Sequence, residues 1–136
     1  MAAKIVTNLS WFINAAALGE LMVLMVQAGI AREDVQRVLA ASCGDSWVAR
    51  HDIPSVLSDY DPTFTLGLAD KDLGLAAELA GMLGVPLEVG AAARAVFDRA
   101  LALFGPGAPE LSPVCLMEQL TGTRLGLKPP DPVTSG

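Results

Sequence analysis

Histidine and cysteine, the residues on which most metal sites depend, are scarce in this sequence. It contains one histidine, His51, and two cysteines, Cys43 and Cys115, which stand far apart and form no Cys-x-x-Cys pair. A zinc site draws three or four grouped ligands from such residues, so the composition excludes one and we expect no metal. With no base or metal ligand near them in the sequence, all three are expected to be structural or incidental.

Basic and aromatic residues are also few. Among 136 residues, nine Lys and Arg stand against 15 Asp and Glu, which gives a formal net charge of −6 at pH 7. The aromatic residues are four Phe, two Trp and one Tyr. Nucleic-acid binding requires a basic surface, usually with stacking rings, so this class of partner is excluded.

The N-terminus lacks the features of a secretory signal. No basic segment precedes a short apolar stretch with a small-residue cleavage site, and the cysteines indicate no disulfide framework, so we expect a cytoplasmic protein. One apolar run, Leu9 to Ile30, is long enough to span a bilayer. Asn14, Glu20 and Gln27 interrupt it and no basic clusters flank it, which favours a buried helix and no membrane partner.

What the sequence has in quantity is residues that favour α-helices. Ala and Leu together number 41, whereas Val and Ile number 16, and no strand-like alternation extends far. Pro54 and Pro62 exclude a long helix from the irregular stretch 45–65. We predict an all-α bundle over residues 1–122 and a proline-rich, flexible tail over 123–136. Its five expected helices, of which the first is the longest, span about 2–28, 32–41, 66–83, 87–104 and 113–120.

Several residues mark the ends and faces of these helices. Thr65 is suited to N-cap the third helix and Gly84 to end it, and Ser112 is suited to N-cap the fifth. In the fourth, apolar residues recur at helical spacing. Arg94 and Asp98 lie four apart on the face that we expect to meet solvent.

Two polar residues share one face of the long first helix. Lys4 and Asn8 lie four apart, so both side chains can reach a single oxygen atom of a ligand. The lysine amine can then donate or accept a proton, while the asparagine amide holds the oxygen in line. The alternative is a solvated lysine beside an asparagine at the helix start, which is the commoner meaning of such a pair taken alone.

The remainder of this helix is apolar on most sides. Glu20 and Gln27 form a second polar stripe on roughly the opposite face, and the residues between the two stripes are apolar. Such a helix has to be surrounded by its own bundle or by a second subunit. We therefore expect the chain to form a homodimer through its first helix.

Four segments occur in a distinctive order: AAKIVTNL at 2–9, SCGDSW at 42–47, DPTFTLGLADKDLGLA at 61–76 and LGVPL at 83–87. Together they resemble the C-terminal half of the β-hydroxyacid dehydrogenases. That family includes 3-hydroxyisobutyrate dehydrogenase, tartronate semialdehyde reductase and glyoxylate reductases, with 6-phosphogluconate dehydrogenase as a more distant relative. The resemblance covers about residues 2–122 and implies the helical C-terminal domain of such an enzyme.

The resemblance also implies roles for single residues. The K-x-x-x-N motif of the family falls on Lys4 and Asn8, which makes Lys4 the general acid or base at the substrate hydroxyl or carbonyl and Asn8 the group that orients the substrate. Lys71, in K-D-L, is implied to reach the cofactor or substrate near the nicotinamide, and Phe64 to line the same pocket. Without the resemblance, Lys71 reads as a solvated residue in a charge run and Phe64 as core.

The implied function is NAD(P)-dependent oxidation of a small β-hydroxyacid, or reduction of the matching semialdehyde. In this family a Rossmann domain binds NAD or NADP ahead of the helical domain, and no G-x-G-x-x-G motif occurs here. We therefore expect that domain to be absent from this chain and the isolated chain to be inactive. The alternative is a non-catalytic helical interaction module that retains the family fold and dimerises.

Overall fold

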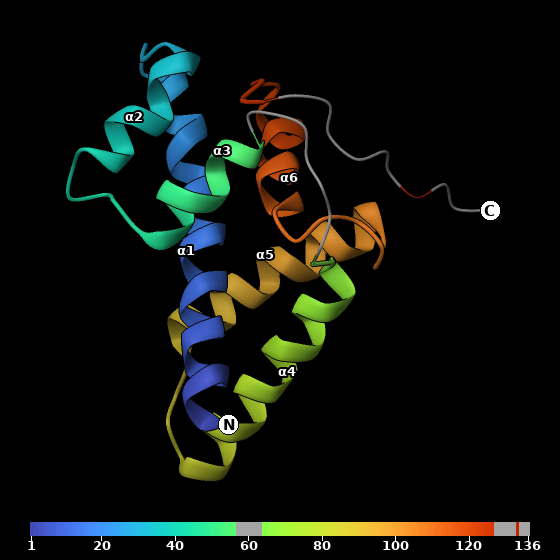
Figure 1. The fold of residues 1–136 in the computed structure, drawn as a ribbon. Helices are drawn as coiled ribbons and strands as arrows, with labels where there is room; N and C mark the ends of the chain where they lie inside the picture. The colour runs from blue at the N-terminus through green and yellow to red at the C-terminus, as the bar shows by residue number, and fades with distance from the viewer. Residues whose placement is uncertain (57–63, 127–132, 134–136) are drawn as a thin grey trace.

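The computed structural model describes residues 1–56, 64–126 and 133, and this part of the chain contains α-helices and no β-strand. The predicted all-α bundle with a long first helix is confirmed (Figure 1). The α-helices are α1 (Ala2–Gln27), α2 (Val35–Ala40), α3 (Ile53–Val56), α4 (Leu66–Leu83), α5 (Glu88–Phe104) and α6 (Ser112–Thr121). A 3-10 turn (Arg32–Asp34) precedes α2, and a π-helical turn (Val48–Asp52) precedes α3.

Helix α1 is the central element, and it packs against α4, α5 and α6 (Figure 1). Phe12 of α1 is buried. Its ring packs edge to face against the ring of Phe97 of α5, with 5.3 Å between the ring centroids. By length and composition α1 could cross a membrane, a test that the core helix of a soluble protein also passes. Its buried residues are Phe12, Ala15, Ala16, Leu18, Gly19, Met22 and Val23.

The bundle does not cover the whole of α1. Val6, Leu21 and Leu24 remain exposed, at 55%, 44% and 65% of their full accessible surface. We expected α1 to be surrounded by protein on nearly all sides, whereas the described part of the chain packs against one side of it. Apolar residues that stay this exposed are available for contact with another protein surface.

Helix α4 begins and ends where its sequence predicts. The Oγ1 atom of Thr65 accepts a hydrogen bond from the backbone N–H of Leu68 at 3.4 Å, which satisfies one free donor of the first turn. The last turn closes on Gly84, whose φ of 68° lies in the left-handed region that glycine adopts without strain.

Two details of α5 and α6 differ from the sequence-based expectation. Arg94 is half-buried, and its guanidinium group reaches across to Gly74 of α4. Arg94 therefore meets solvent only in part, whereas Asp98 is exposed as expected. Leu111, not Ser112, occupies the N-cap position of α6, and the Ser112 hydroxyl donates to the carbonyl oxygen of Pro109 at 2.6 Å.

The packed domain continues beyond residue 122. Thr123 and Leu125 are buried, and Nε2 of Gln27, at the end of α1, donates to Oγ1 of Thr123 at 2.6 Å. The buried carboxylate of Glu118 accepts a hydrogen bond from the backbone N–H of Leu125 at 2.8 Å. The first residues of the expected tail thus belong to the bundle. Apart from Val133, positions 127–136 of that tail lie outside the described residues.

Candidate functional site

The loop between α5 and α6 crosses the start of α4, and it brings Glu110 next to Phe64. The backbone N–H groups of Leu66 and Gly67 donate to the carbonyls of Ala108 and Pro106, at 2.8 and 2.9 Å. A Cβ atom on Gly67 would lie 3.2 Å from Cβ of Pro106, so glycine permits this close approach. The backbone N–H of Glu110 then donates to the carbonyl of Phe64 at 3.0 Å, which sets these two residues side by side.

A polar contact joins α1 to α4 at the predicted site. Nδ2 of Asn8 donates a hydrogen bond to Oδ2 of Asp72 at 3.2 Å. The contact fixes the orientation of the Asn8 amide and leaves its oxygen and its second N–H to bind a ligand. Asp72 is the middle residue of the K-D-L motif, so this bond connects the two sequence motifs in space.

Beside this contact lies a pocket of about 260 Å³. It brings together two residues that the sequence marked, Asn8 and Phe64, although 56 positions separate them. The pocket is mostly aromatic, with one amide and one carboxyl group on its wall. Its lining residues are Asn8, Trp11, Phe12, Phe64 and Glu110.

Two carboxyl groups belong to the surroundings of this pocket: Glu110 lines it, and Asp52 is bonded to Trp11, which also lines it. Nε1 of Trp11 donates to Oδ2 of Asp52 at 2.8 Å, which positions both side chains. Burial, and to a lesser extent the negative charge of Asp52, raise the pKa of Glu110 from 4.5 to about 7. A carboxyl group with this pKa is present in both its neutral and its ionised form near neutral pH.

The two lysines of the candidate site lie outside this pocket. Lys4 is exposed, one helical turn before Asn8 on the same face of α1. Lys71 is exposed on α4 and borders a separate, open hollow together with Arg94 and Glu78. The structure therefore brings Asn8 and Phe64 together in one pocket and places Lys4 and Lys71 on the surface outside it.

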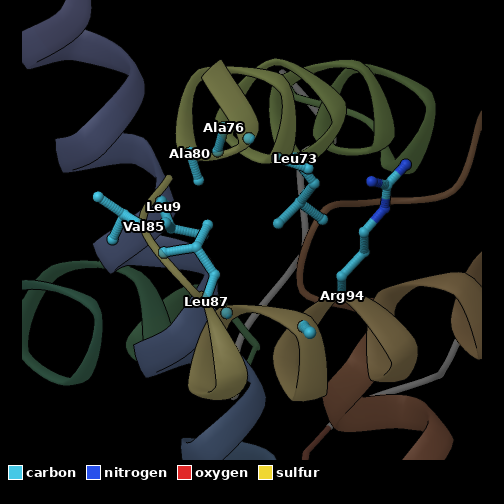
Figure 2. Close-up of a pocket in the computed structure, with 11 residues that line it drawn as sticks. Leu9, Leu73, Ala76, Ala80, Val85, Leu87 and Arg94 are labelled. Carbon is cyan, nitrogen blue, oxygen red and sulfur yellow. The ribbon is translucent and has the colours of Figure 1, made fainter. Parts of the chain in front are cut away.

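A second pocket, of about 340 Å³, lies between α4 and α5. Figure 2 shows Leu73 and Ala76 on its α4 side, with Arg94 rising from α5 toward α4. Leu9 and Leu87 complete an apolar wall. None of the site residues marked by the sequence lines this pocket, so we assign the candidate site to the pocket beside Asn8.

Cysteine and histidine stand apart from the pocket, and within residues 1–56, 64–126 and 133 no cluster suited to a metal ion is found. Cys43 is exposed and Cys115 is buried, and neither forms a disulfide. Burial, with a contribution from Glu118, raises the pKa of the Cys115 thiol to about 12, so this thiol is unreactive at neutral pH. His51 stacks on Trp47, with 3.8 Å between the ring centroids.

The family that the four sequence segments resemble can be compared with known protein families. The family model described as "NAD-binding of NADP-dependent 3-hydroxyisobutyrate dehydrogenase" matches residues 1–114, which is most of the chain. The chain belongs to this family.

Individual members of the 3-hydroxyisobutyrate dehydrogenase family agree with the match. The chain is 36% identical over 124 residues to 2-(hydroxymethyl)glutarate dehydrogenase of Eubacterium barkeri, covering 89% of this chain and 41% of that protein. It is 32% identical over 95 residues to L-threonate dehydrogenase of Cupriavidus necator, covering 69% of this chain and 32% of that protein. The chain thus spans well under half the length of these relatives.

Solved structures of the family share the fold. The crystal structure of 3-hydroxyisobutyrate dehydrogenase from Salmonella typhimurium matches with a TM-score of 0.77 and 28% identity, over 85% of this chain and 41% of that one. The Mycobacterium tuberculosis 3-hydroxyisobutyrate dehydrogenase determined with L-serine matches with a TM-score of 0.75. At 22% identity over 85% of this chain and 42% of that one, the second comparison shows the fold alone.

Three residues at this site, Asp72, Trp11 and Glu110, carry no signal in the sequence that marks them as site residues. Asp72 stands beside Lys71 and was part of the motif, but nothing in the motif indicated its bond to Asn8. Trp11 packs partly against the core and also lines the pocket, and no motif marked it as a site residue. Glu110 lies in a loop rich in Gly and Pro, and no local signal marked it. All three depend on contacts between distant segments, which single-sequence patterns do not report.

Proposed function

We propose that this chain is the C-terminal, substrate-binding domain of an NAD(P)-dependent oxidoreductase that acts on a small β-hydroxyacid or reduces the matching semialdehyde. The observation that carries the proposal is the hydrogen bond between Asn8 and Asp72 beside a small pocket, with Lys4 one turn away on the same helix face. A general acid or base and an orienting amide are what transfer of a hydroxyl proton requires.

In the proposed reaction, Lys4 accepts the proton of the substrate β-hydroxyl as the carbonyl forms, and returns it in the direction of reduction. Asn8 holds the same oxygen in line, because Asp72 fixes its amide. When bound, nicotinamide would supply the hydride acceptor for oxidation and the hydride donor for reduction. No proton is left unassigned, since the hydroxyl proton goes to Lys4 and the hydrogen on carbon leaves with its electron pair.

The chain supplies only part of what an NAD(P) molecule requires. It has no glycine-rich loop of the type that holds a pyrophosphate, while Lys71, exposed beside Asp72, suits the reacting end of the cofactor. We propose that a Rossmann domain outside these 136 residues binds most of the cofactor. The isolated chain then turns over no hydroxyacid, whether NAD or NADP is added.

We further propose that the chain associates with a second copy through α1. The exposed apolar residues Val6, Leu21 and Leu24 support this, since a monomer would leave them in contact with water. A two-fold dimer would cover this stripe of three exposed apolar residues on both copies.

The test is substitution of Lys4→Ala in the complete enzyme, that is, in a protein in which this chain follows an NAD(P)-binding domain. We expect kcat to fall roughly 10²- to 10⁴-fold, the usual contribution of general acid–base catalysis. The stability should change by less than about 0.5 kcal/mol because Lys4 is exposed. Arg99→Ala, which removes an exposed cation from α5, is the control and should leave kcat unchanged.

The alternative, a non-catalytic interaction module, predicts a different result. Lys4→Ala would then leave the activity of the complete protein as it is, because Lys4 would be an inherited surface residue. Hydroxyacid oxidation by the isolated chain with NAD or NADP would also contradict the proposal.

A further inference from the structure

Glu110 occupies a place in the pocket that the proposed reaction does not use. Its backbone N–H is bonded to the carbonyl of Phe64, and its half-buried side chain lines the same pocket as Asn8. In the described part of the chain, the Glu110 side chain forms no hydrogen bond and no ion pair. A carboxyl group at a pocket wall that makes no such bond within the described part of the chain is available to bind a ligand.

The charge of Glu110 responds to its surroundings. Burial and the nearby charge of Asp52 bring its pKa to about 7, and Asp52 is itself held by Trp11. Among the described residues that line the pocket, those from α1 are uncharged, as is Phe64 at the start of α4. No positive charge on the described pocket wall therefore offsets a second negative charge that a ligand brings beside Glu110.

We propose that Glu110 is a specificity-determining residue that selects the substituent on the carbon between the carboxylate and the reacting hydroxymethyl group. This inference rests on the proposed function, since it assumes that Asn8 holds the hydroxyl and that the substituent enters the pocket. Ionised, Glu110 favours a substituent that carries a hydroxyl or ammonium group, which donates to the carboxylate. It rejects a substituent that carries a second carboxylate.

Protonation of Glu110 removes this discrimination. The neutral carboxyl group has an O–H that can donate to a ligand carboxylate, so dicarboxylic substrates become acceptable below pH 7. If a dicarboxylate binds only the neutral form, its relative rate follows the neutral fraction of Glu110. Between pH 6 and pH 8 that fraction falls roughly tenfold for a group with a pKa near 7.

The experiment compares two substrates that differ in one charge: 2-(hydroxymethyl)glutarate and its monoamide, in which the distal carboxylate is replaced by a carboxamide. The quantity measured is the ratio of their kcat/KM values in the complete enzyme from pH 6 to pH 8. Effects of pH on Lys4 and on hydride transfer act on both substrates and cancel in this ratio. We expect the ratio of diacid to monoamide to fall roughly tenfold over this range.

Two variants show whether Glu110 causes the fall. Glu110→Gln has the same shape and no charge, so the ratio should stay constant with pH. Asp52→Asn retains an oxygen that can accept from Trp11 but removes the charge near Glu110, so the midpoint of the fall should move to lower pH. A constant ratio in the unsubstituted enzyme, or the same fall in Glu110→Gln, would overturn the proposal.

A binding measurement separates failure of this inference from failure of the proposed function. If the complete enzyme oxidises neither compound, the proposed function fails, and binding to the chain still tests Glu110. In a Trp47→Phe background, Trp11 is the remaining tryptophan and its fluorescence reports occupancy of the pocket. The ratio of the two affinities should fall with pH as described, and absence of that fall would contradict the role of Glu110.

Discussion

Asn8 and Asp72 are 64 positions apart, and Nδ2 of the first donates to Oδ2 of the second at 3.2 Å. The bond links the first third of α1 to the first turns of α4. An asparagine amide can rotate freely in solution, and a fixed carboxylate acceptor restricts it to one orientation. Asp72 is therefore a positioning residue for the group that is proposed to hold the substrate.

Removal of the Asp72 carboxylate should lower activity more than stability. A hydrogen bond to a charged group contributes about 1.5–3 kcal/mol, so Asp72→Ala should reduce kcat of the complete enzyme roughly ten- to a hundredfold. Asp72→Asn keeps an oxygen that accepts from Asn8 and should recover most of the loss. Steady-state kinetics on both variants checks this, and equal losses in the two would contradict a positioning role.

Two of the three glycines of α4, Gly67 and Gly81, should respond in opposite ways to substitution by alanine. In Gly67→Ala the new Cβ atom meets Pro106 at 3.2–3.3 Å, so the α5–α6 loop has to move, and we expect a loss of about 1–3 kcal/mol. In Gly81→Ala the Cβ atom has no neighbour within 4 Å, and higher helix propensity should add about 0.5–1 kcal/mol. Urea unfolding of the isolated chain measures both, and a neutral Gly67→Ala would contradict the close approach.

The helices could be predicted from the sequence because their ends depend on local chemistry. Thr65 caps α4 and Gly84 ends it in the left-handed conformation, as their residue types suggest. Lys4 and Asn8 could likewise be paired, since helical spacing alone places them on one face.

The environment of each side chain could not be predicted in the same way. Arg94 is solvent-facing on a helical wheel, yet its side chain extends from α5 to Gly74 of α4. Glu110 joins the pocket through backbone bonds to Phe64, which stands 46 positions earlier. Local periodicity carries no information about such contacts between distant segments, and these contacts define the pocket.

The raised pKa of Glu110 predicts how stability depends on pH. Because the folded state binds this proton more tightly than the unfolded state, its contribution is fully present below pH 4.5 and is lost as pH rises to about 7. Glu110→Gln removes the charge, so it should stabilise the chain at pH 8 by about 1–2 kcal/mol, allowing for partial solvent exposure, and have little effect near pH 4. Urea unfolding of both proteins at each pH gives the difference, and a difference independent of pH would contradict a raised pKa.

The exposed stripe of α1 predicts the oligomeric state. Leu21 and Leu24 face solvent on the longest helix, where no other described element covers them. Covering one such leucine at a subunit interface is worth about 1.5–3 kcal/mol, whereas a buried, unpaired charge in its place costs several kcal/mol.

Leu24→Glu should therefore convert a dimer into a monomer of 14.1 kDa. Sedimentation equilibrium at micromolar concentration measures the mass directly, and circular dichroism should show the helices unchanged, because Leu24 makes little contact within its own bundle. Leu120→Glu is the matched control: Leu120 is 54% exposed on a different helix, α6, and its substitution should leave the dimer intact. An unsubstituted chain that sediments as a monomer, or a dimer that survives Leu24→Glu, would exclude association through this face of α1.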